Sequence, residues 1–493
     1  MGHPVNVGIV KAADPSKPLP AAGTLSNVVD GGYCIGCGAC AALDSSIAMA
    51  FDDTLRLQAK LSEDRAPTQA AVQACPFTGE GPNEDALARE IFTDPRIVED
   101  GRIGAHLACF AGWVEEGDLR RRGSSGGIGT WLQRELLARG LVDAVLNVAP
   151  QDGQGEPLFS FTVARTPDEV VGNARTRYYP VEMSGVIRHV LDHPSRYAAI
   201  GTPCFAKALR LVARQSPELR ERLPFVLGIV CGHLKTAAFT QSLAWQCGIE
   251  PDGVQSIDFR AKLEGRPASR YGVSVTGTRI EGAGTATLTR PMEGLIGANW
   301  GHGLFKYQAC EFCDDVLAET ADAVVGDAWL PAYDADYRGT NVVIVRNPVL
   351  LEMLTDARDA GRLHLDDLTP DAVAQSQAGG LRHRREGLAF RLWLTDRAGV
   401  WRPRKRVAAA HRHLSPSMQR IHAARYALGQ ASHGAWQAAR AAQAAGKPAL
   451  FVERMRPMIA AYDRLMKPGL AARTMQLIER KIDAVLTRIG LQR

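Results

Sequence analysis

Three cysteines set close together are the first residues that could do chemistry. Cys34, Cys37 and Cys40 follow one another at intervals of three, which lets three thiolates surround one 4Fe–4S cube. In bacterial ferredoxins a fourth cysteine follows three residues later and serves the other cluster, but Asp44 stands there in this chain. We therefore expect a distant fourth ligand, and Cys75, in a Cys-Pro pair, is the candidate. The alternative is zinc, although zinc sites usually use two separated Cys-x-x-Cys pairs.

A second set of four cysteines is scattered over a longer stretch. Cys310 and Cys313 form another Cys-x-x-Cys pair. Cys204 and Cys231 each follow a short apolar run that predicts a buried strand. Because α/β folds gather functional groups at strand ends, we expect these four thiols to hold a second cluster.

Two of the ten cysteines, Cys109 and Cys247, remain outside these sets. We interpret each of them as a small buried hydrophobe. The chain opens without the apolar core of a signal peptide, and no stretch reaches the roughly 18 apolar residues of a membrane span. The expected location is therefore the cytoplasm, where thiols stay reduced and clustered cysteines indicate metal or redox chemistry.

A Ser/Gly loop at residues 123–127 comes directly before a helical pattern. Free N–H groups at a helix N-terminus form an anion site that would suit a flavin pyrophosphate, and an N-capped helix start explains the residues equally well. A nucleophile elbow with Ser125 as nucleophile is disfavoured, because such an elbow needs a buried strand immediately before it. No Walker A lysine follows the loop, which disfavours phosphate transfer.

The elements that must position these residues alternate between strands and helices. Helical patterns cover residues 128–139 and 236–247, and residues 271–276 and 285–289 indicate a hairpin. The alternation predicts an α/β domain with a mixed, largely parallel sheet. The predicted strands cover residues 143–148, 159–163, 197–201, 225–230, 323–326 and 341–345.

Three regions are expected along the 493 residues: a ferredoxin-like iron–sulfur segment (1–100), an α/β domain with the second cysteine set (101–380) and a helical C-terminal extension (381–493). The extension holds 23 Lys and Arg against 6 Asp and Glu, so it is strongly basic, whereas the rest of the chain is acidic. Its densest run is Arg402-Pro-Arg-Lys-Arg406. A solvated helix face is one interpretation, and docking onto an acidic protein, onto the acidic body itself or onto a membrane surface is another.

Aromatic residues are sparse in the extension, so a nucleic-acid stacking surface is not supported. His233 and His302 flank proposed cluster cysteines. Each is more often a hydrogen-bonding neighbour than a ligand, and a proton-donor role is the sharper hypothesis for either.

An ordered set of motifs resembles the coenzyme F420 hydrogenase/dehydrogenase beta-subunit family, which includes formate dehydrogenase beta subunits and 7-hydroxymethyl chlorophyll a reductase. Together the motifs cover roughly residues 30 to 345. They are Cys34-Ile-Gly-Cys-Gly-Ala-Cys40, Cys75-Pro76, Ser124-Ser-Gly-Gly127, Arg177-Tyr-Tyr-Pro180, Gly201-Thr-Pro-Cys204, Cys231-Gly-His233, Cys310-Glu-Phe-Cys-Asp314 and Gly326-Asp-Ala-Trp329.

The resemblance implies an oxidoreductase with FAD and two 4Fe–4S clusters, in which hydride passes to or from a small-molecule substrate or coenzyme. The redox partner it implies is ferredoxin, NAD(P)H or a deazaflavin coenzyme. Long-tailed relatives look similar to proteins that accompany surface-polysaccharide synthesis. By this resemblance the flavin phosphates would lie on Ser124, Ser125, Gly126 and Gly127, and the rest of the flavin near Asn147, Arg177, Tyr178 and Thr202.

Two other classes of function remain open from the sequence. One is an electron-transfer subunit of a larger complex that has no substrate site of its own. The other is a zinc-stabilised binding protein whose basic tail docks a partner.

Overall fold

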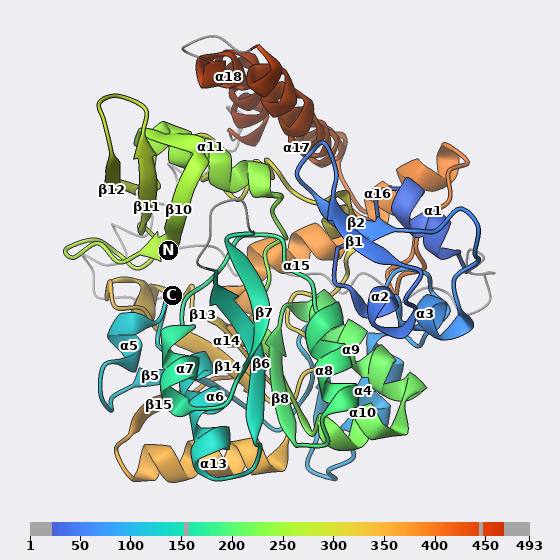
Figure 1. Cartoon of the computed structure of the whole chain (residues 1–493), viewed down its shortest axis with the longest axis vertical. Coiled ribbons are helices and arrows are strands. Elements are labelled where there is room, and N and C mark those ends of the chain that lie inside the picture. Colours follow the sequence, from blue (N-terminus) through green and yellow to red (C-terminus); the bar gives the residue numbers. More distant parts are fainter. Residues whose placement is uncertain (1–21, 152–156, 443–446, 468–493) are drawn as a thin grey trace, which may run out of the picture.

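The computed structural model describes residues 22–151, 157–442 and 447–467. A large sheet forms the lower half of the molecule in the view of Figure 1, with the N-terminal segment on one side and the C-terminal helices above. The sheet has eight strands in the order β15-β5-β14-β13-β9-β8-β6-β7. Their bounds are β5 (Ala108–Val114), β6 (Ala144–Pro150), β7 (Phe159–Ala164), β8 (Tyr197–Gly201), β9 (Phe225–Ile229), β13 (Ala323–Asp327), β14 (Asn341–Val345) and β15 (Leu363–Asp367).

The centre of this sheet is parallel and its edges are antiparallel. β6, β8, β9 and β13 pair in parallel, whereas β7, β14, β5 and β15 join through antiparallel pairs. Five strands (β5, β6, β8, β9 and β13) consequently run in one direction, so the expected mixed, largely parallel sheet is confirmed. The six predicted strands are all present, and β5 and β15 are additional.

Helices cover both faces of the sheet, which explains its near-continuous apolar strands. Successive side chains point to opposite faces, so Val343 packs with one helix layer and Ile344 with the other. The first layer consists of α6 (Ile128–Ala138) and α13 (Pro348–Asp359). The opposite layer consists of α8 (Ser184–Asp192) and α9 (Pro203–Gln215).

The N-terminal segment is a small unit of short helices around a hairpin, on the right in Figure 1. The Tyr307 hydroxyl ties this hairpin to the body: it accepts a 2.8 Å hydrogen bond from the N–H of Leu57 and donates to the carbonyl of the same residue. Its elements are α1 (Leu25–Asp30), α2 (Ala39–Leu43), β1 (Ala48–Phe51), β2 (Leu57–Lys60), α3 (Gln69–Ala74) and α4 (Glu84–Ile91).

A second, antiparallel sheet contains the predicted hairpin. β11 (Gly272–Arg279) pairs with β12 (Thr285–Pro291), and the long strand β10 (Ile249–Ala261) adds a third member that the sequence did not reveal. α11 (Ala237–Cys247) packs against this sheet, and side chains of the last two helices complete the same apolar core.

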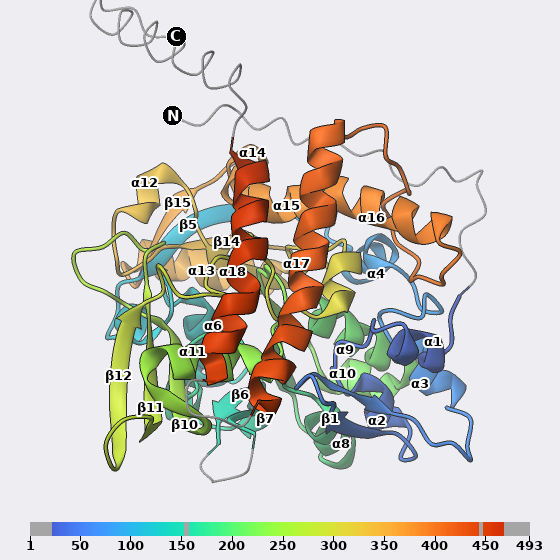
Figure 2. The same ribbon diagram turned by 90° about the horizontal axis from the view of Figure 1, so that it is seen from above.

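The C-terminal region contains the expected helices within the described residues 381–442 and 447–467, but residues 398–415, which include the basic run 402–406, are not helical. α17 (Pro416–Ala441) and α18 (Lys447–Met466) lie side by side (Figure 2). Pro416 begins α17, whereas Pro457 lies inside α18 without ending it. Residues 443–446 and 468–493 lie outside the described residues. The other helices here are α14 (Pro370–Ser376), α15 (Ala378–Arg384) and α16 (Glu386–Arg397).

One buried apolar cluster contains side chains from all three expected regions, from Val28 through Ile344 to Val407. The three regions therefore share a core. No helix in the described ranges is both long enough and apolar enough to cross a membrane. The remaining short elements are β3 (Val98–Asp100), β4 (Gly104–His106), α5 (Leu119–Arg122), α7 (Pro167–Gly172), α10 (Pro217–Arg222), the 3₁₀ helix η1 (Gln308–Phe312) and α12 (Pro331–Asp334).

Candidate metal centres and flavin site

The first cysteine set lines one cavity. Its three N-terminal members lie in the loop that leads into α2, and the fourth ends α3. Gly36 and Gly38 adopt positive φ values of 69° and 78°, and a Cβ on Gly36 would collide with the carbonyl oxygen of Leu57. The glycines therefore allow the tight loop that directs the thiols inward. The cysteines that line this cavity are Cys34, Cys37, Cys40 and Cys75.

Burial and mutual proximity act on these thiols together. Burial raises the pKa of Cys40, and the nearby Cys75 and Cys34 raise it further. Burial likewise raises the pKa of Cys75 to about 12. Four thiols this close cannot all ionise without a cation, whereas a bound metal centre deprotonates coordinating thiols outright. The donor set therefore fits an iron–sulfur cluster.

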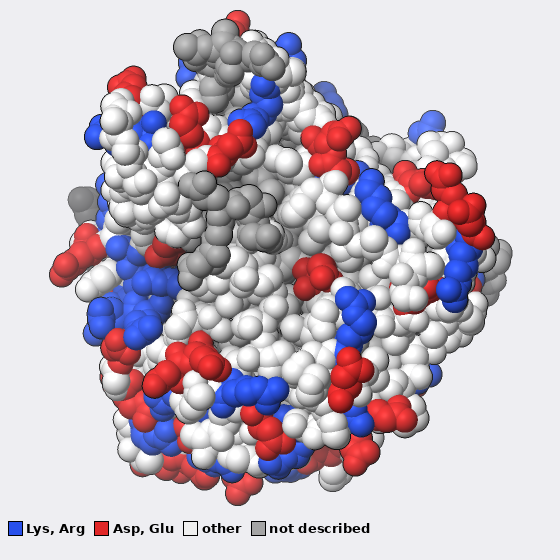
Figure 3. Space-filling view, viewed as in Figure 1, with Lys and Arg blue, Asp and Glu red and all other residues white. Residues whose placement is uncertain are grey.

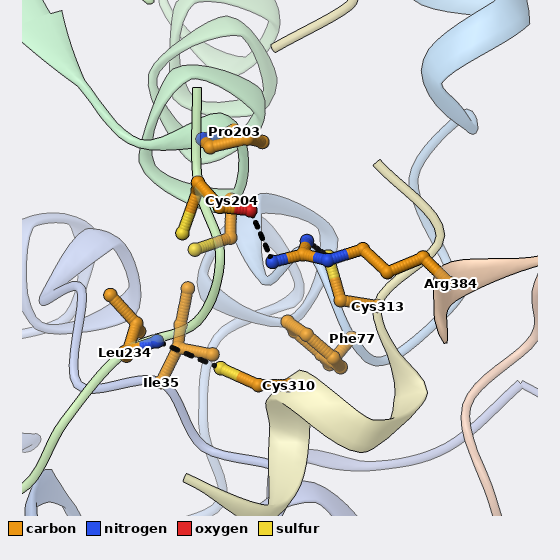
Figure 4. Close-up of a pocket in the computed structure, with 9 residues that line it drawn as sticks. Ile35, Phe77, Pro203, Cys204, Leu234, Cys310, Cys313 and Arg384 are labelled. Carbon is orange, nitrogen blue, oxygen red and sulfur yellow. Dashed lines mark hydrogen bonds between the residues drawn. The ribbon is translucent and has the colours of Figure 1, made fainter. Parts of the chain in front are cut away.

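The second cysteine set lines another cavity (Figure 4). Cys204 lies in the first turn of α9 after β8, and Cys231 follows β9 closely. Cys310 lies in η1 and Cys313 ends it. The structure thus brings together the two strand-end thiols and the Cys-x-x-Cys pair, which are far apart in the sequence.

Hydrogen bonds already reach two sulfur atoms of this second set. The N–H of Leu234 donates to the Sγ of Cys310 at 3.2 Å, and the guanidinium of Arg384 donates to the Sγ of Cys313 at 2.7 Å. Burial raises the pKa of Cys310 to about 12, and the neighbouring Cys231 adds to the shift. This donor set also fits a cluster bound by four thiolates.

The two cavities are neighbours. Ile35, between the first two cysteines of the chain, and Phe77, just after Cys75-Pro76, line both of them. The same two side chains therefore separate the two cysteine sets. In the described ranges, no group of three or more His, Cys, Asp or Glu side chains is gathered closely enough for a single metal ion.

Cys109 and Cys247 are buried among apolar side chains, in β5 and at the end of α11. Burial raises the pKa of the Cys109 thiol to about 12 and that of Cys247 to about 11. Their position agrees with the interpretation of both as small core residues.

The Ser/Gly loop leads into α6, as predicted, and its hydroxyls are engaged. The Ser124 hydroxyl accepts the N–H of Thr176 at 2.9 Å, and the Ser125 hydroxyl donates to the carbonyl of Thr340 at 3.0 Å. Gly127 has a φ of 88° at the helix start. A Cβ on Gly126 would collide with the carbonyl of Gly112, so the loop is pressed against β5. Since Ser125 donates to a backbone carbonyl, it lacks the partner base of a nucleophile.

A half-buried lysine that the sequence did not single out holds this loop. The ammonium of Lys262 donates to the carbonyls of Arg120, Ser125 and Arg338. Burial lowers the pKa of Lys262 to about 7, and the charges of Arg175 and Arg120 add to that effect. The lysine therefore places a cation directly behind the candidate phosphate loop.

The other predicted flavin residues have different neighbours and do not line a single surface with the loop. Asn147 is buried in β6, between Gln133 and Asn173. Arg177 covers the ring of Phe159 at 4.8 Å, and its Nε has no hydrogen-bond partner among the described residues.

Tyr178 and Thr202 are the last two of the predicted flavin residues. Tyr178 is partly buried in an aromatic group and packs edge-on against Trp300 at 4.8 Å between ring centroids. Thr202 is the N-cap residue of α9, and its hydroxyl lies 3.5 Å from the Sγ of Cys204.

A hollow opens on the face shown in Figure 3, and mostly uncharged side chains line its visible part. Comparison with the same view in Figure 1 places it between β10–β12 and the ends of β6 and β7. Charged side chains gather mainly around its edge.

The two histidines have different surroundings. His233 is fully buried against Trp300, and its Nε2 has no hydrogen-bond partner in the described part of the chain. Burial lowers the pKa of His233 well below its usual value, and Lys235 lowers it further. The Nε2 of His302 lies 2.9 Å from the carboxylate of Asp463, which makes it a hydrogen-bonding neighbour.

The basic run 402–406 is not a solvated face, and that interpretation was wrong. Arg406 pairs with Glu319 and donates to Asp314 from its backbone N–H at 2.9 Å, and Lys405 lies 3.5 Å from the same aspartate. The side chain of Arg406 is only 7% exposed. The run therefore docks onto the acidic body of its own chain, because Asp314, next to Cys313, needs buried cations to remain ionised.

The neighbouring acid of the same motif is held in the same way. Glu311 is 1% exposed and contacts Lys306, His383 and Arg391. Burial raises the pKa of Glu311, but Lys306 and Arg391 more than offset this and keep its pKa well below the usual range. Sequence reasoning missed His383, Arg384 and Arg391, because no local pattern distinguishes them from the other basic residues of the extension.

Comparison with known proteins identifies the class and then the family. A model described as coenzyme F420 hydrogenase/dehydrogenase, beta subunit N-term matches residues 109–188, and its C-terminus counterpart matches residues 195–371. These matches cover over half of the chain. The protein is thus an electron-transfer oxidoreductase subunit by class. It belongs to the coenzyme F420 hydrogenase/dehydrogenase beta-subunit family.

The chain is also similar to a solved chain of the xenon-derivatised F420-reducing NiFe hydrogenase complex from Methanosarcina barkeri. The two share 18% sequence identity with a TM-score of 0.43, over 58% of this chain and 92% of that one. Among curated protein sequences no match is found. The first cysteine set and the basic run both lie outside the family-matched residues.

Proposed function

We propose that this protein is an oxidoreductase that binds two 4Fe–4S clusters and FAD and relays electrons between them. The observation that carries the proposal is the pair of adjacent cavities, each lined by four cysteines and separated by the shared side chains of Ile35 and Phe77. Such adjacency suits electron transfer from one centre to the next. Family membership supports redox chemistry independently of this geometry.

Each cysteine set has a distinct part in the proposal. The first cluster would be held by Cys34, Cys37, Cys40 and Cys75 in the ferredoxin-like region. The second would be held by Cys204, Cys231, Cys310 and Cys313, within the α/β domain. We propose that residues 1–100, 101–380 and 381–493 form three functional regions, which share one apolar core.

The flavin would lie with its phosphates at the Ser/Gly loop. The positive end of α6 and the ammonium of Lys262 favour an anion there. Bound FAD would supply the exchange between single electrons and two-electron hydride transfer, while the protein positions and tunes it. We propose that its isoalloxazine end lies near Arg177 and that a small substrate reaches it through the hollow of Figure 3. The buried Nε of Arg177, which has no hydrogen-bond partner among the described residues, supports this proposal.

The proposal also includes a location and a redox partner. We propose a cytoplasmic protein whose redox partner is ferredoxin, NAD(P)H or a deazaflavin coenzyme. An electron-transfer subunit without its own substrate site is the second candidate, and the family's beta-subunit character favours it.

Cysteine variants test the two cluster assignments. Anaerobically purified protein should contain about eight irons with matching acid-labile sulfide, and one flavin. Cys40→Ala and Cys310→Ala should each lose about four irons. Cys247→Ala is the matched control, because that buried thiol lies outside both cavities and should retain all the iron. Zinc in place of iron would refute the proposal, and iron without flavin would favour the second candidate.

A further inference from the structure

Among the described residues that line the second cysteine cavity, Arg384 alone carries a charge. It ends α15 and is 1% exposed, and it lies beyond the family-matched residues. Its guanidinium donates to the Sγ of Cys313 at 2.7 Å and to the carbonyls of Cys231 and Gly232, each at 2.8 Å. Figure 4 shows this side chain reaching across the cavity from the C-terminal region.

None of the described carboxylates forms an ion pair with this buried guanidinium. The guanidinium donates hydrogen bonds to one thiol and to the backbone carbonyls of Asp315, Cys231 and Gly232. Its Nε has no hydrogen-bond partner among the described residues. A buried charge without an opposite charge is strongly destabilising. The thiolates of a bound cluster would supply the missing negative charge.

The thiol side of the contact agrees with this. The Sγ of Cys313 accepts the 2.7 Å hydrogen bond from the guanidinium, so a thiolate at that position would be bonded directly to a positive charge. The guanidinium is therefore placed to stabilise negative charge on this cysteine set.

The first cavity is built differently. The described residues that line it are uncharged, and the backbone N–H of Ala59 donates to the Sγ of Cys34 at 3.4 Å. A charged side chain lines the second cavity and donates to one of its sulfurs, whereas none of the described residues lining the first cavity is charged. This difference gives a means of adjusting the second centre without the first.

We propose that Arg384 is a positioning residue that raises the reduction potential of the second cluster. The inference rests on the proposed function, because it needs a cluster at that cavity. Cluster potentials depend on net charge and on hydrogen bonds to the sulfurs. A cation bonded to Cys313 stabilises the more negative, reduced state, so its removal should make the second centre harder to reduce while the first stays unchanged.

An anaerobic redox titration followed by electron paramagnetic resonance tests this. Arg384→Gln should lower one of the two midpoint potentials by an amount equal to at least a tenfold change in the reduced-to-oxidised ratio, about 59 mV for one electron. Arg384→Lys keeps the charge and should recover most of the shift. Arg346→Gln is the matched control, because Arg346 is also 1% exposed but donates only to backbone carbonyls.

Each result is decisive. Unchanged midpoints in Arg384→Gln with full iron content would overturn the inference and leave the cluster assignment intact. Loss of the second cluster in both Arg384 variants would also overturn it, because the residue would then be needed for assembly rather than for potential. A wild-type protein without iron would instead refute the proposed function.

Discussion

Removing the Arg406 side chain tests whether the basic run is part of the folded body. Its guanidinium is 7% exposed and pairs with Glu319 and Asp314, which are themselves almost fully buried. Breaking a buried ion pair by removing one partner costs about 3–5 kcal/mol. Lys405 and Arg385 still face the two carboxylates, so we expect Arg406→Ala to cost about 3 kcal/mol, at the low end of that range.

The corresponding thermal shift follows from the size of the chain. At about 2.1 cal/mol/K of unfolding entropy per residue, 493 residues give about 1 kcal/mol/K. Cooperative unfolding then lowers Tm by about 3 °C. The assay is differential scanning calorimetry of the anaerobic holoprotein, with Arg412→Ala as the control because Arg412 is exposed. A Tm for Arg406→Ala equal to that of Arg412→Ala would refute the docking of the run.

Three further predictions follow from single side chains. Burial holds the pKa of His422 at about 4, so between that pH and about 6.5 the unfolded chain binds more protons. Stability should therefore fall as pH falls through this window, and urea titrations of His422→Gln should show a flatter profile, whereas an unchanged slope would contradict the assignment. Tyr307→Phe should cost about 1–3 kcal/mol in urea unfolding, because the buried N–H of Leu57 loses its acceptor; a loss below about 0.5 kcal/mol would show that the tether is unimportant. Lys262→Met should lower flavin content while iron content stays at the wild-type level, and equal loss of both would point to general unfolding.

Local patterns in the sequence predicted much of the fold. The central strands are short runs of buried apolar residues, such as 341–345, because helices cover both faces of the sheet. β15 was missed because its sequence, Leu-His-Leu-Asp-Asp, alternates into charged residues at the sheet edge. β5 was missed because Gly112, a residue that disfavours strands, interrupts its apolar run.

For the cysteine sets, too, the sequence shows local spacing but not the packing between distant segments. The interval of three residues at Cys34, Cys37 and Cys40 is a local loop property, so the sequence displays it directly. The shared wall of Ile35 and Phe77 depends on packing between distant segments, and no spacing encodes it. Arg384 is 71 residues from Cys313, and its burial cannot be read from a run of basic residues.

The positive charge of the basic run likewise does not predict which residues contact it in the fold. Arg406 and Asp314 are 92 residues apart, and only the fold brings them together. The extension looked like a surface for a partner because its excess of cations was visible. The acids that neutralise Arg406 and Lys405 lie elsewhere in the chain.

Magnetic coupling between the two reduced centres tests the central claim most directly. Two paramagnetic clusters in cavities that share Ile35 and Phe77 as lining residues should interact. The electron paramagnetic resonance spectrum of the fully reduced protein should therefore be broadened and split, and Cys40→Ala or Cys310→Ala should each reduce it to a simple signal from one cluster. A wild-type spectrum equal to the sum of the two variant spectra would contradict adjacent clusters at these cavities.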